Sequence, residues 1–192
     1  MDIFTNHILG WLTVLALLGA GFYTMKVIGE EKSSFKDDSY QVTFGPLTLL
    51  IPNWWAITTQ SDFEIRFERT DTRYDWYAVF RYFPSHGGKD LPELLKEKLN
   101  LEEMEFDEDV VFETDSRVLF RDSRVQEYFQ EVIRVEGKGS QKVTERFYYD
   151  VYLMRAQNDP GYFIFESRSS VLNGLVEGPY FEESLSELEL AT

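Results

Sequence analysis

The stretch that decides the fold is Arg146-Phe-Tyr-Tyr-Asp-Val-Tyr-Leu153. Its odd-numbered positions, from Phe147 to Leu153, are all large and apolar or aromatic, whereas the positions between them are polar or amphipathic. Successive side chains of a strand point to opposite faces of a sheet, so this alternation predicts a strand with one face on the core. Phe63-Glu-Ile-Arg-Phe-Glu-Arg69 alternates in the same way. A sheet therefore organises the fold.

The other β-rich runs are separated by short turn-forming segments, which favour antiparallel pairing. Gly137-Lys-Gly-Ser140 is predicted to be the hairpin turn between the two longest strands. The same segment resembles a shortened phosphate-binding loop, but it lacks the Walker spacing, so the turn is the better interpretation. Strands are expected over residues 40–51, 63–69, 76–83, 110–113, 117–121, 125–136, 143–155 and 162–168.

Two segments change to helical spacing. The first begins with Asp90 as N-cap and Pro92 in the first turn, and its apolar residues recur at helical intervals up to Leu99. The second is expected over residues 180–190, with its apolar side chains on one side. The order of elements predicts an α+β domain, an antiparallel β-sheet with helices packed on it as an α/β/α sandwich.

Composition excludes several classes of protein. The chain of 192 residues has 34 acidic and 19 basic side chains and a net charge of -15, which argues against nucleic-acid binding. It has no cysteine and two histidines, so disulfide frameworks, thiol catalysis, zinc fingers and multi-histidine metal sites are ruled out. No cofactor, metal site or catalytic residue is predicted.

The N-terminal segment is apolar. Residues 3–25 carry no formal charge, and such a run would reach about 34 Å as a helix, enough for a hydrocarbon core of about 30 Å. A cleaved signal peptide would carry Lys or Arg in its first residues, and a buried helix would keep a polar face. Residues 1–25 are therefore predicted to be a transmembrane anchor in the lipid bilayer. Its apolar positions are Ile8, Trp11, Leu12, Leu15, Leu18 and Phe22.

Residues 26–40 are predicted to be a polar tether, followed by one extramembrane domain over residues 41–192. The expected location is a cell membrane, either inner or photosynthetic, crossed once. The bias of Lys26, Lys32 and Lys36 after the span places the domain in the cytoplasm. Interleaved acidic residues weaken that bias, so the side of the membrane stays open.

Several short motifs resemble one family. The strand ending in Pro52-Asn-Trp54, the helix opening with Leu91-Pro-Glu-Leu-Leu95, the strand meander and the terminal Phe181-Glu-Glu-Ser-Leu185 helix are similar in order to Mog1/PsbP-like domains. The resemblance covers residues 40–190 and implies an α/β/α sandwich with a non-enzymatic role. PsbP proteins are extrinsic subunits of the photosynthetic oxygen-evolving complex, and Mog1 binds a small GTPase. The resemblance also favours a periplasmic or lumenal domain, but fold analogy does not establish function.

Two groups of residues are candidates for an interface. Six carboxylates crowd residues 102–109, but they lack the glycine and spacing of a calcium loop, so a solvated acidic connection between helix and strand is the better interpretation. If the segment is functional, a basic partner surface fits it better than a cation does. Aromatic residues cluster at residues 54–55 and 74–77, where half should be core and the rest exposed for docking. The candidate interface comprises Trp54, Trp55, Tyr74, Trp76, Tyr77, Glu102, Glu103, Glu105 and Asp107.

These features predict a non-catalytic, membrane-anchored accessory subunit that docks on a larger membrane complex, photosynthetic or respiratory, and stabilises its assembly. An anchored hydrolase or ligand-binding protein that uses His86 is the alternative, since His86 could act as a base near neutral pH. Against it, Ser85 is only a chain neighbour of His86, and no nucleophile elbow is present. A sensor or chaperone that uses the sheet face differs from the first function only in how long the partner stays bound.

Overall fold

The computed structural model describes residues 11–21, 23, 34–69, 75–85, 87–142, 145–157 and 159–191. The chain divides into two compact units, residues 1–39 and residues 40–192. In the first unit, residues 11–21 and 34–37 are helical, and every side chain of residues 11–21 is exposed.

The first unit corrects the predicted localisation. Of the six anchor positions, Trp11, Leu12, Leu15 and Leu18 lie in the described helix, whereas Ile8 and Phe22 fall outside the described residues. Among the described residues no helix is long and apolar enough to cross a membrane. The prediction of a single-pass membrane protein is therefore wrong.

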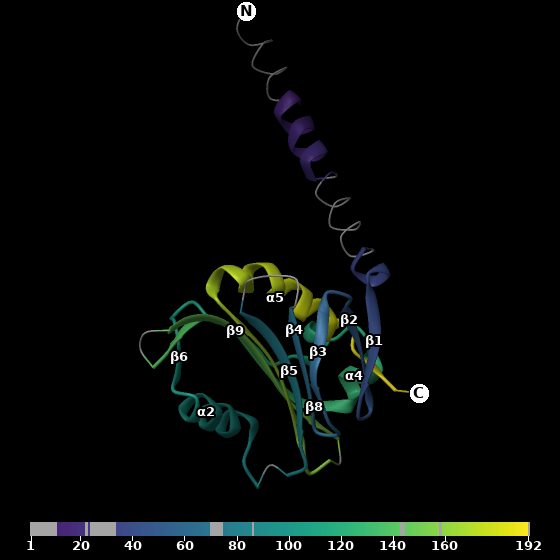
Figure 1. Ribbon diagram of the computed structural model, residues 1–192. Helices are drawn as coiled ribbons and strands as arrows, with labels where there is room; N and C mark the ends of the chain where they lie inside the picture. The colour runs from purple at the N-terminus through teal and green to yellow at the C-terminus, as the bar shows by residue number, and fades with distance from the viewer. Residues whose placement is uncertain are drawn as a thin grey trace, which may run out of the picture. The chain divides into compact units, whose positions relative to one another are not determined.

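The second unit is built on one large antiparallel sheet (Figure 1). Its strand order is β3-β4-β5-β10-β9-β8-β6, and β7 pairs with β8 beside this path. The antiparallel pairing confirms the sheet that the alternating segments predict. The strands are β3 (Trp55–Gln60), β4 (Glu64–Arg69), β5 (Trp76–Phe83), β6 (Met104–Phe106), β7 (Val111–Glu113), β8 (Phe129–Gln141), β9 (Glu145–Ala156) and β10 (Tyr162–Ser169).

A small second sheet has the order β1-β2-β11 and is formed by β1 (Ser39–Phe44), β2 (Leu47–Pro52) and β11 (Glu189–Leu190). Residues 40–51 are thus a hairpin rather than one run. Gly45 turns the chain with φ at +57°, a left-handed conformation that glycine adopts without a steric penalty. The end of the predicted C-terminal helix is a strand, because β11 pairs with β2.

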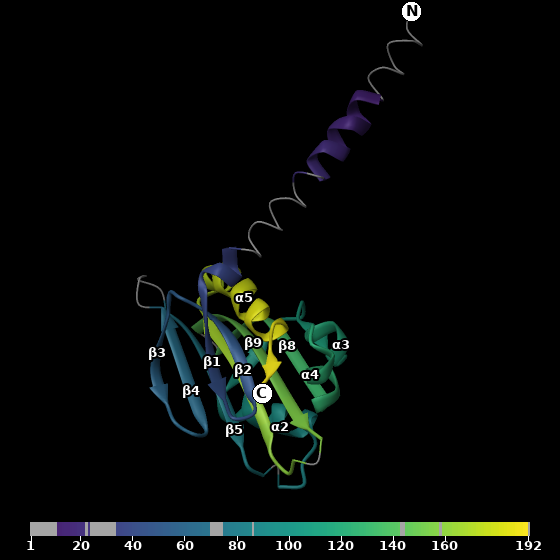
Figure 2. The ribbon, with the colours of Figure 1, turned by 90° about the vertical axis from the view of Figure 1, so that its right-hand side faces the viewer.

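Helices cover both faces of the large sheet. Helix α5 (Val171–Ser186), with α3 (Ser116–Leu119) and α4 (Ser123–Tyr128), packs on an aromatic-rich core that also includes the small sheet (Figure 2). Helix α2 (Leu91–Leu101) covers a second core on the opposite face, formed with β6, β8 and β9. The α+β class with helices packed on antiparallel strands is confirmed.

Local signals explain where α2 begins. Asp90 accepts a hydrogen bond from the backbone N–H group of Glu93 at 2.9 Å, and the Glu93 carboxylate accepts one from the backbone of Asp90. This capping box satisfies backbone donors that the first helical turn leaves unpaired. The predicted N-cap is confirmed.

Three sequence predictions differ from the structure. Residues 117–119 and 125–128, expected in strands, are helical, because the Asp115 and Asp122 side chains cap α3 and α4. Gly137-Lys-Gly-Ser140 lies within β8 and is no turn; a Cβ atom on Gly139 would come 2.5 Å from a backbone oxygen of β6. The final helix begins nine residues earlier than expected, at Val171.

Candidate functional site

Helix α2 leaves part of its sheet face uncovered. The helix contacts β6, β8 and β9, whereas the same face continues across β10, β5 and β4. Beside apolar residues such as Val79 and Ile164, the strands there carry a group of charged and polar side chains. These residues are Glu64, Arg66 and Glu68 on β4, Tyr77 and Arg81 on β5, and Glu166 and Arg168 on β10.

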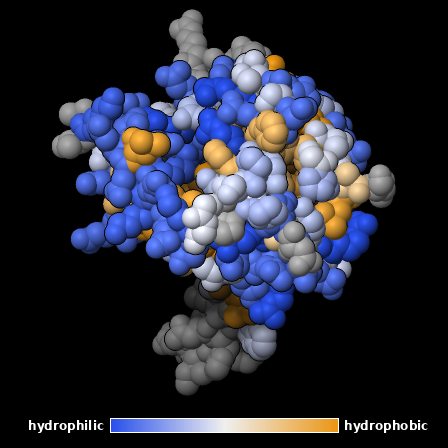
Figure 3. Space-filling model, turned by 90° about the horizontal axis from the view of Figure 1, so that it is seen from below, coloured by the Kyte–Doolittle hydropathy of each residue, from blue (hydrophilic) through white to orange (hydrophobic). Residues whose placement is uncertain are grey.

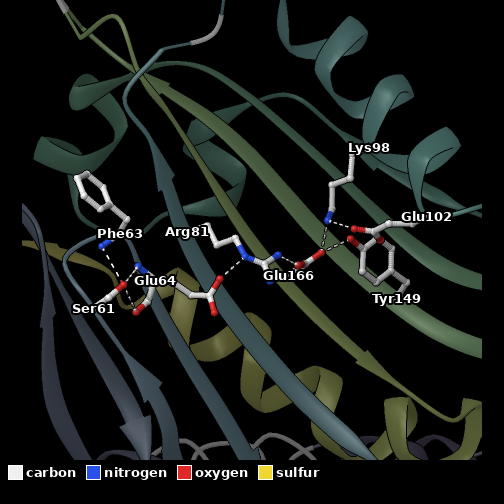
Figure 4. Close-up of polar contacts among 8 residues, drawn as sticks. All are labelled: Ser61, Phe63, Glu64, Arg81, Lys98, Glu102, Tyr149 and Glu166. Atoms are coloured by element: carbon white, nitrogen blue, oxygen red, sulfur yellow. Dashed lines mark hydrogen bonds and ion pairs between the residues drawn. The ribbon is translucent and has the colours of Figure 1, made fainter.

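A chain of ion pairs joins this uncovered face to α2 (Figure 4). Arg81 donates to Glu64 at 2.6 Å and to Glu166 at 2.5 Å. The other oxygen of Glu166 lies 2.7 Å from Nζ of Lys98, which also donates to Glu102 at 2.6 Å. Two cations are thus held between three carboxylates, and Glu166 is the central one.

Burial and neighbouring charges shift the pKa values of the groups in this chain of ion pairs. Burial alone would raise the pKa of Glu166, but the charge and hydrogen bond of Lys98, with help from Tyr149 and Arg81, lower it below that of a free glutamate. Burial likewise works against the charge on Lys98, yet Glu166 and Glu102 raise the pKa of Lys98. The buried Tyr149 hydroxyl donates to Glu166, and burial with that charge raises the pKa of Tyr149. Glu166 is therefore a fixed anion at neutral pH.

Above this chain lies a groove of about 720 Å³ between α2 and strands β4, β5 and β10, which we call the α2 groove. Its polar lining includes Glu64, Arg81, Lys98 and Glu102, and its apolar lining comes from both the helix and the strands. Figure 3, which views the molecule from below, shows hydrophobic residues gathered as separate patches on a largely hydrophilic surface.

A second hollow of about 580 Å³ on the same face is lined by several arginines that already have partners. Arg66 pairs with Glu68 at 2.7 Å and stacks 4.1 Å above the ring of Tyr77. Arg146 donates to the Asp107 carboxylate at 2.9 and 2.5 Å. Two predicted interface residues, Tyr77 and Asp107, are thus each held by an arginine.

The outer side of α5 carries a row of exposed apolar residues, which we call the α5 stripe. Leu172, Leu175 and Val176 are 76%, 60% and 55% exposed, and Pro179 continues the row one turn later. Their spacing places them on one side of the helix. In the same stretch the polar Asn173 is buried. This half of α5 is therefore apolar toward solvent and partly polar toward the core.

The contacts of Glu177 explain how α5 can keep a polar side chain buried in the core. Its side chain is 2% exposed, accepts a hydrogen bond from the Trp55 indole at 2.9 Å and pairs with Arg69. Trp54 donates to the same carboxylate at 3.4 Å, and its ring packs edge-on against Tyr180 with centroids 5.0 Å apart. The buried charge of Glu177 is thus satisfied by three donors.

The predicted interface residues are therefore spread over several environments. Trp55 and Trp76 are buried in the core with centroids 4.2 Å apart, so neither ring faces a partner. Trp54 is half-buried beside α5. Of the acidic candidates, Glu102 pairs with Lys98, and Glu103 and Glu105 are exposed. Tyr74 and His86 lie outside the described residues.

Within the described part of the chain, no three acidic or histidine side chains come together as a metal site would require. The acidic segment 102–109 instead runs through β6, and its members hold separate positions. The α5 stripe was missed from sequence, although Val171-Leu-Asn-Gly-Leu-Val-Glu-Gly-Pro-Tyr-Phe181 carries the signal: only Asn173 and Glu177 are polar in it.

No family model and no curated protein sequence matches the chain. Among solved structures it is similar to cyanobacterial PsbP from Synechocystis sp. PCC 6803, with a TM-score of 0.49 and 11% identity over 80% of this chain and 91% of that one. It is also similar to the Saccharomyces cerevisiae Ran-binding protein Mog1p, with a TM-score of 0.47 and 10% identity over 79% and 95% of the two chains. A Pseudomonas aeruginosa protein of unknown function gives 0.48 and 10% over 80% and 98%. At these TM-scores and identities the likeness carries no functional argument.

Proposed function

We propose that this protein is a non-catalytic accessory subunit that docks on another protein of a larger assembly through the α5 stripe and stabilises that assembly. One observation carries the proposal: in residues 172–179 the polar side chains of Asn173 and Glu177 are buried, whereas the apolar side chains are exposed. A helix that is apolar on its outer side is typical of a buried helix, so its stable state has that side covered.

The neighbourhood of the α5 stripe supports docking. Trp54 and Tyr180 are half-buried at the side of the helix, and aromatic residues with partial exposure are the types that anchor interfaces. The helix itself is rigidly seated, since Phe181 and Leu185 on its inner side are fully buried. A pre-formed apolar surface loses little conformational entropy on binding.

The interior charges support a role without catalysis. Glu166 is held ionised by two cations, and Glu177 is held by Arg69 and two indoles. Groups paired in this way act as fixed counter-ions that hold the helices against the sheet.

Site-specific photo-crosslinking in cells tests the proposal. A photoreactive phenylalanine analogue is placed at Leu172 in the full chain, and at Val118 as a control, because Val118 on α3 is 67% exposed. We expect one defined crosslinked protein from position 172 and none from position 118. Leu175→Glu should remove that product, since a charge in the centre of an apolar contact costs about 2 kcal/mol or more, roughly 30-fold in affinity.

Three results would overturn the proposal. The first is a product from position 172 that Leu175→Glu leaves at full yield. The second is the same product from position 118, which would indicate random collision. The third is a crosslink to a second copy of this chain alone, which would make the α5 stripe a self-association surface. Circular dichroism of Leu175→Glu checks that the chain still folds.

A further inference from the structure

We propose that the α2 groove is a second binding site and that it takes a basic segment of a partner protein bearing an apolar anchor residue. The groove lies on the sheet face opposite α5, so this inference goes beyond the function proposed for the α5 stripe. Its volume of about 720 Å³ is that of a recognition pocket, within the range of roughly 300–1,000 Å³ that small ligands and anchor side chains occupy.

The walls of the α2 groove fit an apolar anchor. Phe83 and Tyr162 stack with ring centroids 4.8 Å apart and planes 10° apart, and this aromatic pair lines the groove. Leu101, at the end of α2, lines the opposite side and is 83% exposed. Phe63 adds a third apolar contact and is also exposed. An apolar side chain placed between these residues would cover surface that now faces water.

The cations of the groove are already neutralised. Arg81 and Lys98 both contact the buried Glu166, and each also contacts a second carboxylate, Glu64 or Glu102. These two outer carboxylates are about a third exposed, so they form the surface that a ligand meets. An anionic ligand would have to displace these carboxylates from Arg81 and Lys98, whereas a cationic ligand could pair with the carboxylates while they keep their present partners.

Other groups around the groove extend this acidic surface. From α2, Glu97 lines the groove and pairs with Lys89 at 2.5 Å while its side chain stays 57% exposed. Beyond Glu102 the chain continues into Glu103 and Glu105, which are exposed. The whole chain has a net charge of -15. Such a field attracts basic segments and repels acidic ones, so charge complementarity selects a basic occupant.

Fluorescence anisotropy with the full chain and a labelled basic-apolar peptide tests the proposal. The peptide carries Lys and Arg on both sides of a Leu-Trp pair. Two comparison peptides replace either the Leu-Trp pair by Ser-Gly or the basic residues by Glu. We expect the basic-apolar peptide to bind at least about fivefold more tightly than the Ser-Gly peptide, because loss of a central apolar anchor usually weakens binding by this much. The acidic peptide should bind more weakly still.

Amino-acid substitutions test whether the peptide binds in the α2 groove. Leu101→Ser should weaken binding of the basic-apolar peptide about fivefold without harming the fold, since Leu101 is exposed. Glu97→Gln should weaken it about twofold, as expected for an exposed charge. The matched controls are Leu172→Ser on α5 and Glu131→Gln on β8, whose side chain is 52% exposed; neither should change binding.

The outcomes separate this site from the α5 stripe. Equal binding of the basic-apolar and Ser-Gly peptides would show only general charge attraction and would overturn the proposal. Tighter binding of the acidic peptide would overturn the choice of a basic occupant. Weakening by Leu172→Ser with no effect of Leu101→Ser would move the peptide to the α5 stripe. Because the crosslinking experiment reads only the α5 stripe, each proposal can fail alone.

Discussion

Helices α2 and α5 cover opposite faces of one sheet, but they distribute polar and apolar side chains in opposite ways. In α2 the leucines Leu91, Leu94 and Leu95 are buried, and the exposed side carries charged residues such as Glu93 and Glu97. In the first half of α5 the polar residues are buried and the leucines are exposed.

The difference indicates what each helix needs in order to be stable. Packing of α2 on the sheet buries its apolar side and leaves its charges in water, so the domain alone completes it. Packing of α5 buries Glu177 in a polar contact and leaves apolar surface in water. In the proposed function, a partner protein covers that surface. Both helices also insert one charged group, Lys98 or Glu177, against the strands.

The largest expected effect is at Glu177. Glu177→Ala should lower the free energy of unfolding by about 3–5 kcal/mol, because it removes one partner of a buried ion pair and the acceptor of the Trp55 indole. Glu97→Ala on α2 is the control and should change it by less than about 0.5 kcal/mol. Urea denaturation measures both. Similar values for the two variants would contradict the view that α5 is anchored by its buried charge.

A smaller effect is expected at the glycines of α5. A Cβ atom on Gly174 would lie 2.2 Å from the Tyr148 ring, whereas one on Gly178 would lie 3.4 Å from it. Gly174→Ala should therefore cost about 1–3 kcal/mol through overpacking. Gly178→Ala should be neutral or stabilise by up to about 1 kcal/mol through helix propensity. Thermal unfolding of the two variants compares them; equal losses would mean that α5 does not rest on Tyr148 through Gly174.

The sequence predicted those parts of the fold that depend on local signals. The Asp90 cap and the leucine spacing are contained within α2, and the alternation of β4 and β9 is a property of each strand alone. The beginning of α5 at Val171 was not predicted. Its inner side is set by contact with Tyr148 and with the strands, which are distant in sequence.

The candidate sites were less predictable for the same reason. The sequence indicated that the aromatic cluster at residues 54–55 is partly core and partly exposed. Glu177, which binds both tryptophans, lies 123 and 122 residues further along the chain. Likewise Arg81, Glu166 and Lys98 come from three separate elements. Strand register brings the first two together, since Arg81 is opposite Ile164 and Glu166 opposite Val79. The residues that line the α2 groove come from separate segments of the sequence, so no single segment reveals it.

The pH dependence of stability tests the contact between Lys98 of α2 and Glu166. The pKa of Glu166 in the folded chain is below that of a free glutamate, so the unfolded chain binds more protons at mildly acidic pH. Ionised Glu166 therefore contributes stability above about pH 4.5, and the contribution is lost as the pH falls toward the folded pKa. Glu166→Gln lacks this titration.

The stability difference between the original chain and Glu166→Gln should thus be largest near neutral pH and shrink below about pH 4.5. Urea denaturation of both proteins between pH 3 and pH 7 measures this difference. Lys98→Met removes the cation that holds the pKa down and should make the stability of the chain less sensitive to acid. A difference that stays constant across this range would show that Lys98 and Arg81 do not hold Glu166 ionised.

The smallest expected effects are at the helix N-caps, and they complete the comparison. Asp90→Ala should destabilise the domain by about 1 kcal/mol, because the Asp90 side chain accepts from the backbone of Glu93. Ser170→Ala should change stability by less than about 0.5 kcal/mol, because the Ser170 side chain makes no capping hydrogen bond at the beginning of α5. Urea denaturation resolves the pair. If Ser170→Ala costs as much as Asp90→Ala, then α5 is also started by its own sequence; if it costs nothing, packing against the strands determines where α5 begins.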